Sequence, residues 1–285
     1  MLTGGEDEQR KNARPSLVPT DLPPRTHKYK YSGFQHLQGV ISEEYRRFID
    51  ENRSPFVIFT DFPPNEIKAH EEEFPGKVDY SPPLQILLLY LHSLPHEEAA
   101  EGFGYRLAAK AEDMGILDSL SLRGATCTKT PVREKEADRS WAPHKLPPGR
   151  STQWPTVALE VAFSESRERV KQDMAWWLHQ SAGDVRLAIS IDIKRQSGNI
   201  YVNSWEQPER TPTRQHPRPA PKPVQEIVIS RGEDGQPPKV TGNDLIIPFH
   251  QMMLRYPRPG ETDFVFTKED LLKVAQRVWY AMDNM

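Results

Sequence analysis

Residues 157 to 163 read Val-Ala-Leu-Glu-Val-Ala-Phe, an alternation that predicts a β-strand with two different faces. One face carries Glu160 between Ala158 and Ala162. The large apolar residues make up the other face: Val157, Leu159, Val161 and Phe163. A carboxylate on a buried face costs several kcal/mol unless it is paired or binds a metal. Glu160 is therefore a candidate functional residue, and its small neighbours predict space beside it for an ion or a substrate.

Along the rest of the sequence, segments with the apolar spacing of a helix alternate with segments that have the pattern of a strand. A helix is expected at 166–181, where apolar residues recur at helical spacing before Gly183, and strands are expected at 185–193 and 199–205. The remaining expected elements are helices at 84–91, 95–114 and 267–283, and strands at 120–122, 125–128, 224–230 and 244–248. This order predicts an α/β fold built around a mixed sheet.

Proline and charge suggest how the chain is divided. The 27 prolines and a hydrophobic fraction of 36% indicate a core of ordinary size with long irregular segments. The expected parts are a disordered tail at 1–30, an N-terminal decoration at 31–81, a main α/β domain at 82–256 and a C-terminal helix at 257–285. The decoration holds a helical piece at 42–52 and a strand at 55–60. Within the main domain, residues 207–223 form a proline- and arginine-rich insertion.

Composition excludes several classes of protein. A net charge of −3 and a pI near 6.3 disfavour a protein that coats nucleic acid by bulk electrostatics. The single cysteine, Cys127, excludes an internal disulfide framework and a cysteine zinc site. No apolar run resembles a secretory signal or approaches the ~20 residues of a membrane span. We therefore expect a soluble intracellular protein, in the cytoplasm or nucleus, with an oligomeric state that the sequence leaves open.

A second acidic residue, Asp138, precedes Glu160 by 22 positions. Two carboxylates from adjacent strands can hold Mg²⁺, which prefers oxygen ligands. The ion can lower the pKa of a bound water and offset charge on a phosphoryl group. Alternatively, Glu160 forms a structural ion pair with an arginine such as Arg123 or Arg133. Spacing alone leaves both interpretations open.

Three segments follow one another in an order that points to a known superfamily. They are K-E-A-D-R-S-W at 135–141, P-T-V-A-L-E-V-A-F-S-E-S at 155–166 and G-D-V-R-L-A-I-S-I-D-I at 183–193. Together they resemble the PD-(D/E)XK restriction-endonuclease-like superfamily, and most closely a divergent branch of it. The similarity covers roughly residues 84 to 256. It implies a mixed sheet flanked by helices and Mg²⁺-dependent hydrolysis of phosphodiester bonds in nucleic acid.

The resemblance also implies site residues. Asp138 and Glu160 match the two acidic metal ligands. A glutamate on the first core helix often completes such a site, and here Glu98 or Glu101 could serve, with Glu97 a less favoured option.

The sequence departs from the superfamily pattern at two positions. Ala137 replaces the proline before Asp138, and Ala162 replaces the lysine that usually follows the second acidic residue by two and helps to activate water. In the divergent branch a lysine on the next helix can take that role. Lys171 is the candidate, although its offset aligns poorly and Asp173 stands near the expected place. The triplet Asp192-Ile-Lys194 spells D-x-K on the following strand and is interpreted as a decoy.

Two further features stay open. His92 and His96 are four residues apart, but the intervening Pro95 disfavours a regular helical pair. His96, near Glu98, could line the site, although a solvent-facing histidine is the simpler expectation. The segment 123–150 holds seven basic and three acidic residues. It could form one wall of a nucleic-acid groove or an ordinary solvated region.

Two main functions follow from these observations. The first is a Mg²⁺-dependent nuclease or nuclease-like DNA-binding protein. The alternative is a catalytically inactive descendant of that fold, a binding or scaffold protein whose proline-rich arm at 207–223 docks a protein partner. An enzyme of another class that reuses the pocket is a weaker third possibility. Whether the chain is an enzyme depends on the acidic pair.

Overall fold

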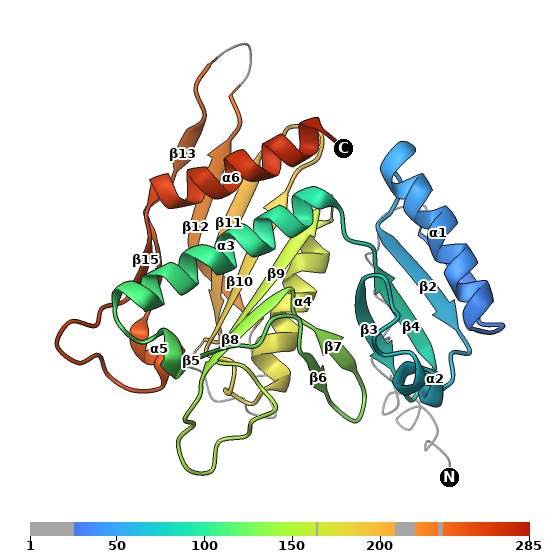
Figure 1. The fold of residues 1–285 in the computed structure, drawn as a ribbon, viewed down its shortest axis with the longest axis horizontal. Coiled ribbons are helices and arrows are strands. Elements are labelled where there is room, and N and C mark those ends of the chain that lie inside the picture. The colour runs from blue at the N-terminus through green and yellow to red at the C-terminus, as the bar shows by residue number, and fades with distance from the viewer. Residues whose placement is uncertain (1–25, 164, 209–219, 233–235) are drawn as a thin grey trace, which may run out of the picture.

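The computed structural model of the protein describes residues 26–163, 165–208, 220–232 and 236–285. Helices and strands in this part of the chain are arranged around two large sheets (Figure 1). Each sheet is mixed, because β9 and β10 run parallel in one and β1 and β2 run parallel in the other. The expected α/β architecture is confirmed, with two mixed sheets in place of one.

The first sheet has seven strands in the order β13-β12-β11-β10-β9-β8-β5. Its strands in chain order are β5 Leu120–Leu122, β8 Arg139–Pro143, β9 Val157–Phe163, β10 Leu187–Ile193, β11 Ile200–Glu206, β12 Lys222–Ser230 and β13 Lys239–Thr241. The helix α4 (Arg167–Gln180) connects the parallel strands β9 and β10, as a crossover must. It begins at Ser166, whose hydroxyl accepts a hydrogen bond from the backbone N–H of Arg169.

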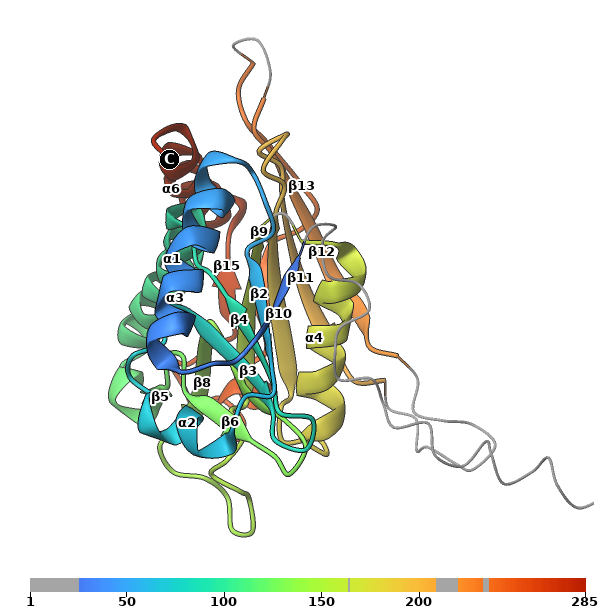
Figure 2. The same ribbon diagram turned by 90° about the vertical axis from the view of Figure 1, so that its right-hand side faces the viewer.

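Helices cover both faces of this sheet. Figure 2 shows α3 (Leu94–Asp113) and α6 (Lys268–Asp283) on one side and α4 on the other. The large apolar residues of β9 pack in one core with α3 and α6, whereas Ala158 and Ala162 pack with α4. Glu160 therefore points to the α4 side. At the start of α6, Thr267 and Asp270 form a capping box, in which the side chain of each accepts a hydrogen bond from the backbone N–H of the other.

The second sheet has six strands in the order β1-β2-β4-β3-β7-β6. They are β1 His27–Lys30, β2 Phe56–Thr60, β3 Lys77–Ser81, β4 Ile86–Tyr90, β6 Cys127–Lys129 and β7 Glu134–Glu136, accompanied by α1 Phe34–Asp50 and α2 Pro64–Ala69. The chain passes from β7 of this sheet to β8 of the other. Because β7 also pairs with β3, with Asp79 opposite Lys135, the start of β3 lies beside the segment that carries Asp138.

Three expectations need correction. The helix expected at 84–91 is wrong: β4 pairs with both β2 and β3, and its leucines are buried on both faces, so their spacing carries no helical information. The boundary drawn between 81 and 82 falls inside the β3–β4 hairpin. Of the tail expected to be disordered, residues 1–25 lie outside the described residues, and 27–30 form β1.

The remaining elements complete the large core. They are the 3₁₀ helix Leu117–Ser119, β14 Leu245–Ile247, α5 Phe249–Met253 and β15 Phe264–Phe266. Residues 209–219 of the proline-rich insertion lie outside the described residues, and 222–223 already belong to β12. Within the described ranges, every helix is too short or too polar to cross a membrane.

Candidate functional site

Asp138 and Glu160, the acidic pair expected from the sequence, lie side by side in the structure. The strands β8 and β9 are antiparallel with Arg139 opposite Leu159, which places Asp138 against the middle of β9. The Asp138 backbone N–H donates to the Leu159 carbonyl at 3.0 Å, and its Oδ2 accepts from the Val161 N–H at 2.6 Å. Both carboxylates are buried. The local strand pairing thus fixes their relative position.

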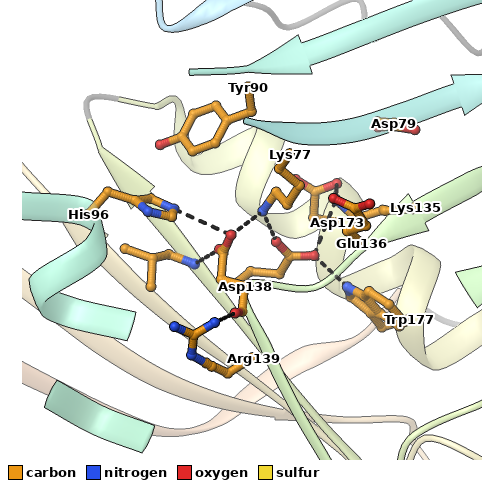
Figure 3. Close-up of polar contacts among 12 residues, drawn as sticks. Lys77, Asp79, Tyr90, His96, Lys135, Glu136, Asp138, Arg139, Asp173 and Trp177 are labelled. Carbon is orange, nitrogen blue, oxygen red and sulfur yellow. Dashed lines mark hydrogen bonds and ion pairs between the residues drawn. The ribbon is translucent and has the colours of Figure 1, made fainter. Parts of the chain in front are cut away.

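A lysine from the second sheet lies between these two carboxylates, and Figure 3 shows its side chain beside Asp138. The Nζ atom of Lys77, the first residue of β3, is 2.8 Å from Asp138 Oδ1 and 2.5 Å from Glu160 Oε2. The Lys77 side chain is buried beside the Tyr90 ring. Burial alone would lower the pKa of Lys77, but the two carboxylates raise it. Lys77 is therefore held as an ammonium ion.

Gly76 allows β3 to approach β4 closely enough to place this lysine. Its backbone φ angle is +145°, a conformation that residues other than glycine rarely adopt. A Cβ atom at this position would collide with the backbone carbonyl of Tyr90. The glycine is thus a local requirement for the position of Lys77.

Glu160 has a second lysine partner. Lys135 on β7 places its Nζ 3.2 Å from Glu160 Oε1 and 3.0 Å from Asp173 Oδ1. The indole N–H of Trp177 donates to the same Glu160 oxygen at 2.5 Å. Asp173 and Trp177 come from α4, which packs over this face of β9 (Figure 3). Glu160 is thus paired with two lysines, where the sequence suggested Arg123 or Arg133.

The ion pairs continue outward from this centre. Asp79 accepts from Arg133 at 2.6 Å and from Arg169 at 3.3 Å, and Arg169 also lies 3.2 Å from Asp173. Four basic groups therefore face four acidic groups: Lys77, Lys135, Arg133 and Arg169 against Asp79, Asp138, Glu160 and Asp173. Buried charges of this kind require mutual compensation.

Glu165 lies at the edge of this cluster and is also buried. Burial and the nearby charge of Asp173 raise the pKa of Glu165 to about 8. The side chain is therefore mostly protonated at neutral pH and adds no full charge to the cluster.

Two stacked histidines flank Asp138 on the side away from Glu160. The rings of His92 and His96 are 4.2 Å apart and nearly parallel at 17°. Their Nδ1 atoms lie 2.6 and 3.4 Å from Glu97 Oε1, and their Nε2 atoms lie 3.8 and 3.4 Å from Asp138 Oδ1. Burial alone would lower the pKa of His96, but the Asp138 carboxylate raises it to about 9.

The expectation of a solvent-facing His96 is wrong, because this residue has an exposure of 0%. Pro95 lies in the first turn of α3, where proline is tolerated, so it does not prevent the pairing of the two histidines.

The other residues expected at the site pair with partners outside the acidic pair. Glu98 pairs with Arg277 of α6, and Glu101 forms an ion pair with Arg139. The Lys171 side chain is 55% exposed on α4 and pairs with Glu168. Of the three helix glutamates considered, Glu97 is the one that reaches toward Asp138, through the histidines.

The space around the acidic pair is uneven. A cleft of about 220 Å³ opens beside Asp138 and is lined by Lys77, both histidines and Glu97, among others. On the other side, next to Glu160 and Ala162, only about 20 Å³ remains, enough for roughly one water molecule. The space expected beside Glu160 is thus mostly filled, and a ligand has room on the Asp138 side.

Comparison with known proteins finds similarity among solved structures. No protein-family model and no curated protein matches the chain. The chain is similar to the crystal structure of a candidate nuclease belonging to DUF820 from Anabaena variabilis, with a TM-score of 0.40 and 9% identity. The similarity covers 73% of this chain and 97% of that chain.

Proposed function

We propose that the protein is a divalent-metal-dependent hydrolase of phosphodiester bonds in nucleic acid, with Asp138 and Glu160 as its metal ligands. The observation that carries this proposal is the position of Lys77, whose ammonium lies between one oxygen of each carboxylate. Two carboxylates that converge on one positive charge offer the hard oxygen ligands that Mg²⁺ prefers. The donor set therefore fits a magnesium ion.

Lys77 takes the role of the lysine that is missing at position 162. It comes from β3 and approaches the acidic pair through space, where the superfamily pattern uses the strand of the second carboxylate. From this position an ammonium group can orient an attacking water or stabilise an oxygen on which negative charge develops. A bound Mg²⁺ would lower the pKa of a water ligand and offset phosphoryl charge.

The cleft beside Asp138 is the side from which a phosphodiester would approach. Lys77 and Arg139 line it, and both can contact phosphate oxygens. Arg139 pairs with Glu101 at the rim, so this guanidinium would exchange an acidic partner for a phosphate on binding. Of the basic residues of 123–150, Arg139 lines this cleft and Arg133 and Lys135 belong to the buried cluster; the segment remains a candidate groove wall.

A second function, that of a catalytically inactive binding protein, is favoured by a different observation. Each of the four carboxylate oxygens of Asp138 and Glu160 already has a partner, from Lys77, Lys135, Trp177 and the Val161 backbone. An ion would have to share these oxygens or displace the lysine. In this alternative the cluster is structural, and protein docking through residues 207–223 remains a prediction.

Cleavage assays on single- and double-stranded DNA and RNA, with Mg²⁺ or Mn²⁺, distinguish the two functions. The nuclease proposal expects metal-dependent cleavage that Asp138→Asn and Glu160→Gln each reduce by roughly 10²–10⁴-fold. The matched control is Lys171→Ala, which removes an exposed lysine and should keep full activity. A folded wild-type protein that cleaves none of these substrates supports the binding protein, and full activity in both carboxylate variants overturns the proposed ligands.

A further inference from the structure

The histidine pair beside Asp138 contains buried nitrogen atoms that lack hydrogen-bond partners. Among the described residues, the Nε2 atoms of His92 and His96 and the Nδ1 atom of His96 make no hydrogen bond. Buried polar groups in proteins are almost always paired, because an unpaired one costs free energy. His96 is fully buried, so water does not easily compensate this cost.

Glu97 determines which edge of His92 can bind a cation. An ionised carboxylate only accepts hydrogen bonds, so the contact of 2.6 Å from His92 Nδ1 to Glu97 Oε1 assigns a proton to Nδ1. In the neutral ring, Nε2 then carries the lone pair, and it points toward Asp138 Oδ1 at 3.8 Å. A lone pair and a carboxylate oxygen face each other with no hydrogen between them. A cation is the natural partner for both.

The spacing of these atoms fits a single coordination shell. Ligands that bind Zn²⁺ tetrahedrally at about 2.0–2.2 Å lie about 3.4 Å from one another. Asp138 Oδ1 is 3.4 Å from His96 Nε2 and 3.8 Å from His92 Nε2. The two rings are stacked nearly parallel, so each would rotate about its side-chain bonds to direct its Nε2 lone pair at one ion, and the cleft beside them leaves room for further ligands.

We propose that His92, His96 and Asp138 form a second cation site, which binds a divalent transition metal such as Zn²⁺ or Co²⁺ and uses Glu97 to orient the histidines. Imidazole nitrogen suits these metals better than Mg²⁺, and a bound metal would replace the proton of His96 that faces Asp138. A carboxylate hydrogen-bonded to the far nitrogen of a ligating histidine is the usual outer support of such sites. The site shares Asp138 with the proposed magnesium position, but its occupancy does not require cleavage, so it goes beyond the proposed function.

Titration of the chelator-treated full-length protein with Co²⁺ tests the inference. The visible absorption of Co²⁺ reports nitrogen ligands, calorimetry gives the stoichiometry, and a competing Zn²⁺ titration gives the relative affinity. We expect one equivalent of Co²⁺ with nitrogen ligation in the wild type, displaced by Zn²⁺. His92→Asn and His96→Asn should each weaken Co²⁺ binding at least tenfold, and Glu97→Gln by about 10–100-fold.

The control variant is His144→Asn, which removes an exposed histidine after β8 and should leave Co²⁺ binding unchanged. Circular dichroism verifies that each variant is folded. His92 is partly exposed, so its variant keeps the test open if the buried His96 variant does not fold. Unchanged Co²⁺ affinity in His92→Asn, or a folded wild type that binds no Co²⁺, overturns the inference.

The Glu160→Gln variant separates this inference from the proposed function. It should abolish Mg²⁺-dependent cleavage and keep Co²⁺ binding within a few-fold of the wild type, because Glu160 does not contact the histidines. Cleavage without histidine-dependent Co²⁺ binding would leave the nuclease proposal intact and remove the second site. Histidine-dependent Co²⁺ binding without cleavage would keep the second site and remove the nuclease proposal.

Discussion

Replacement of Lys77 by methionine removes the ammonium but keeps most of the side-chain volume. Asp138 and Glu160 would then lose a partner at 2.8 and 2.5 Å while staying buried. Breaking a buried ion pair by removal of one partner costs about 3–5 kcal/mol, because the remaining charge stays uncompensated. For a chain of this size, that free energy corresponds to a decrease in Tm of roughly 6–20 °C.

Urea denaturation at pH 7, followed by circular dichroism, measures this loss directly. The variant should also respond to divalent cations, since the two carboxylates no longer have an ammonium between them and the flexible, uncharged methionine side chain can move aside for Mn²⁺. We therefore expect added Mn²⁺ to recover part of the lost free energy of unfolding in Lys77→Met, and more than it adds to the wild type.

The matched control is Lys171→Met, a change at an exposed lysine that should alter stability by no more than about 0.5 kcal/mol. The reasoning is refuted if Lys77→Met is as stable as the control. It is also refuted if the variant is destabilised as expected but Mn²⁺ has no greater effect on it than on the wild type.

Three further predictions concern the surroundings of the site. The pKa of Glu165 is raised to about 8 from 4.5, so the stability that its protonated form provides is present below pH 4.5 and lost as the pH rises through 8. Glu165→Gln should therefore raise the free energy of unfolding by roughly 2–4 kcal/mol at pH 9 and by little at pH 4. Urea titrations at both pH values measure this difference. Gly76→Ala should lower the free energy of unfolding by at least about 1–3 kcal/mol and reduce cleavage. The control is Gly33→Ala: Gly33 also has a positive φ, but a Cβ atom there meets nothing within 4 Å, so this change should lower the free energy of unfolding less in the same denaturation assay. Glu98→Gln should keep metal-dependent cleavage within a few-fold of the wild type in the nuclease assay, because Glu98 pairs with Arg277 of α6; a loss comparable to that of Asp138→Asn would return it to the site.

Local pattern was sufficient to predict the strand that carries Glu160. β9 covers Val157–Phe163, the same residues as the alternation, and α4 lies within one residue of its expected ends. The alternation of side chains along a strand leaves its signal within a few residues, and so does a serine that caps a helix. Such elements can be predicted without knowledge of the tertiary structure.

Lys77 could not be predicted in the same way, because its position depends on contacts between distant parts of the chain. It reaches Glu160 across 83 positions, and only the pairing of β3 with β7 and β4 brings it there. Within the decoration expected at 31–81 no strand is predicted around Lys77, although Val78 and Tyr80 alternate with polar residues as a strand would. Lys135 was visible three residues before Asp138, but nothing in the local sequence assigned it to Glu160.

The most direct test of the central claim is a crystal structure of the protein soaked with Mn²⁺, with anomalous diffraction to locate the ion. If Asp138 and Glu160 are the metal ligands, we expect an anomalous peak within about 2.0–2.6 Å of carboxylate oxygens of both residues, with Lys77 moved aside or lying next to the ion. A structure in which Lys77 still bridges the two carboxylates, with no peak in contact with either of them, would contradict it.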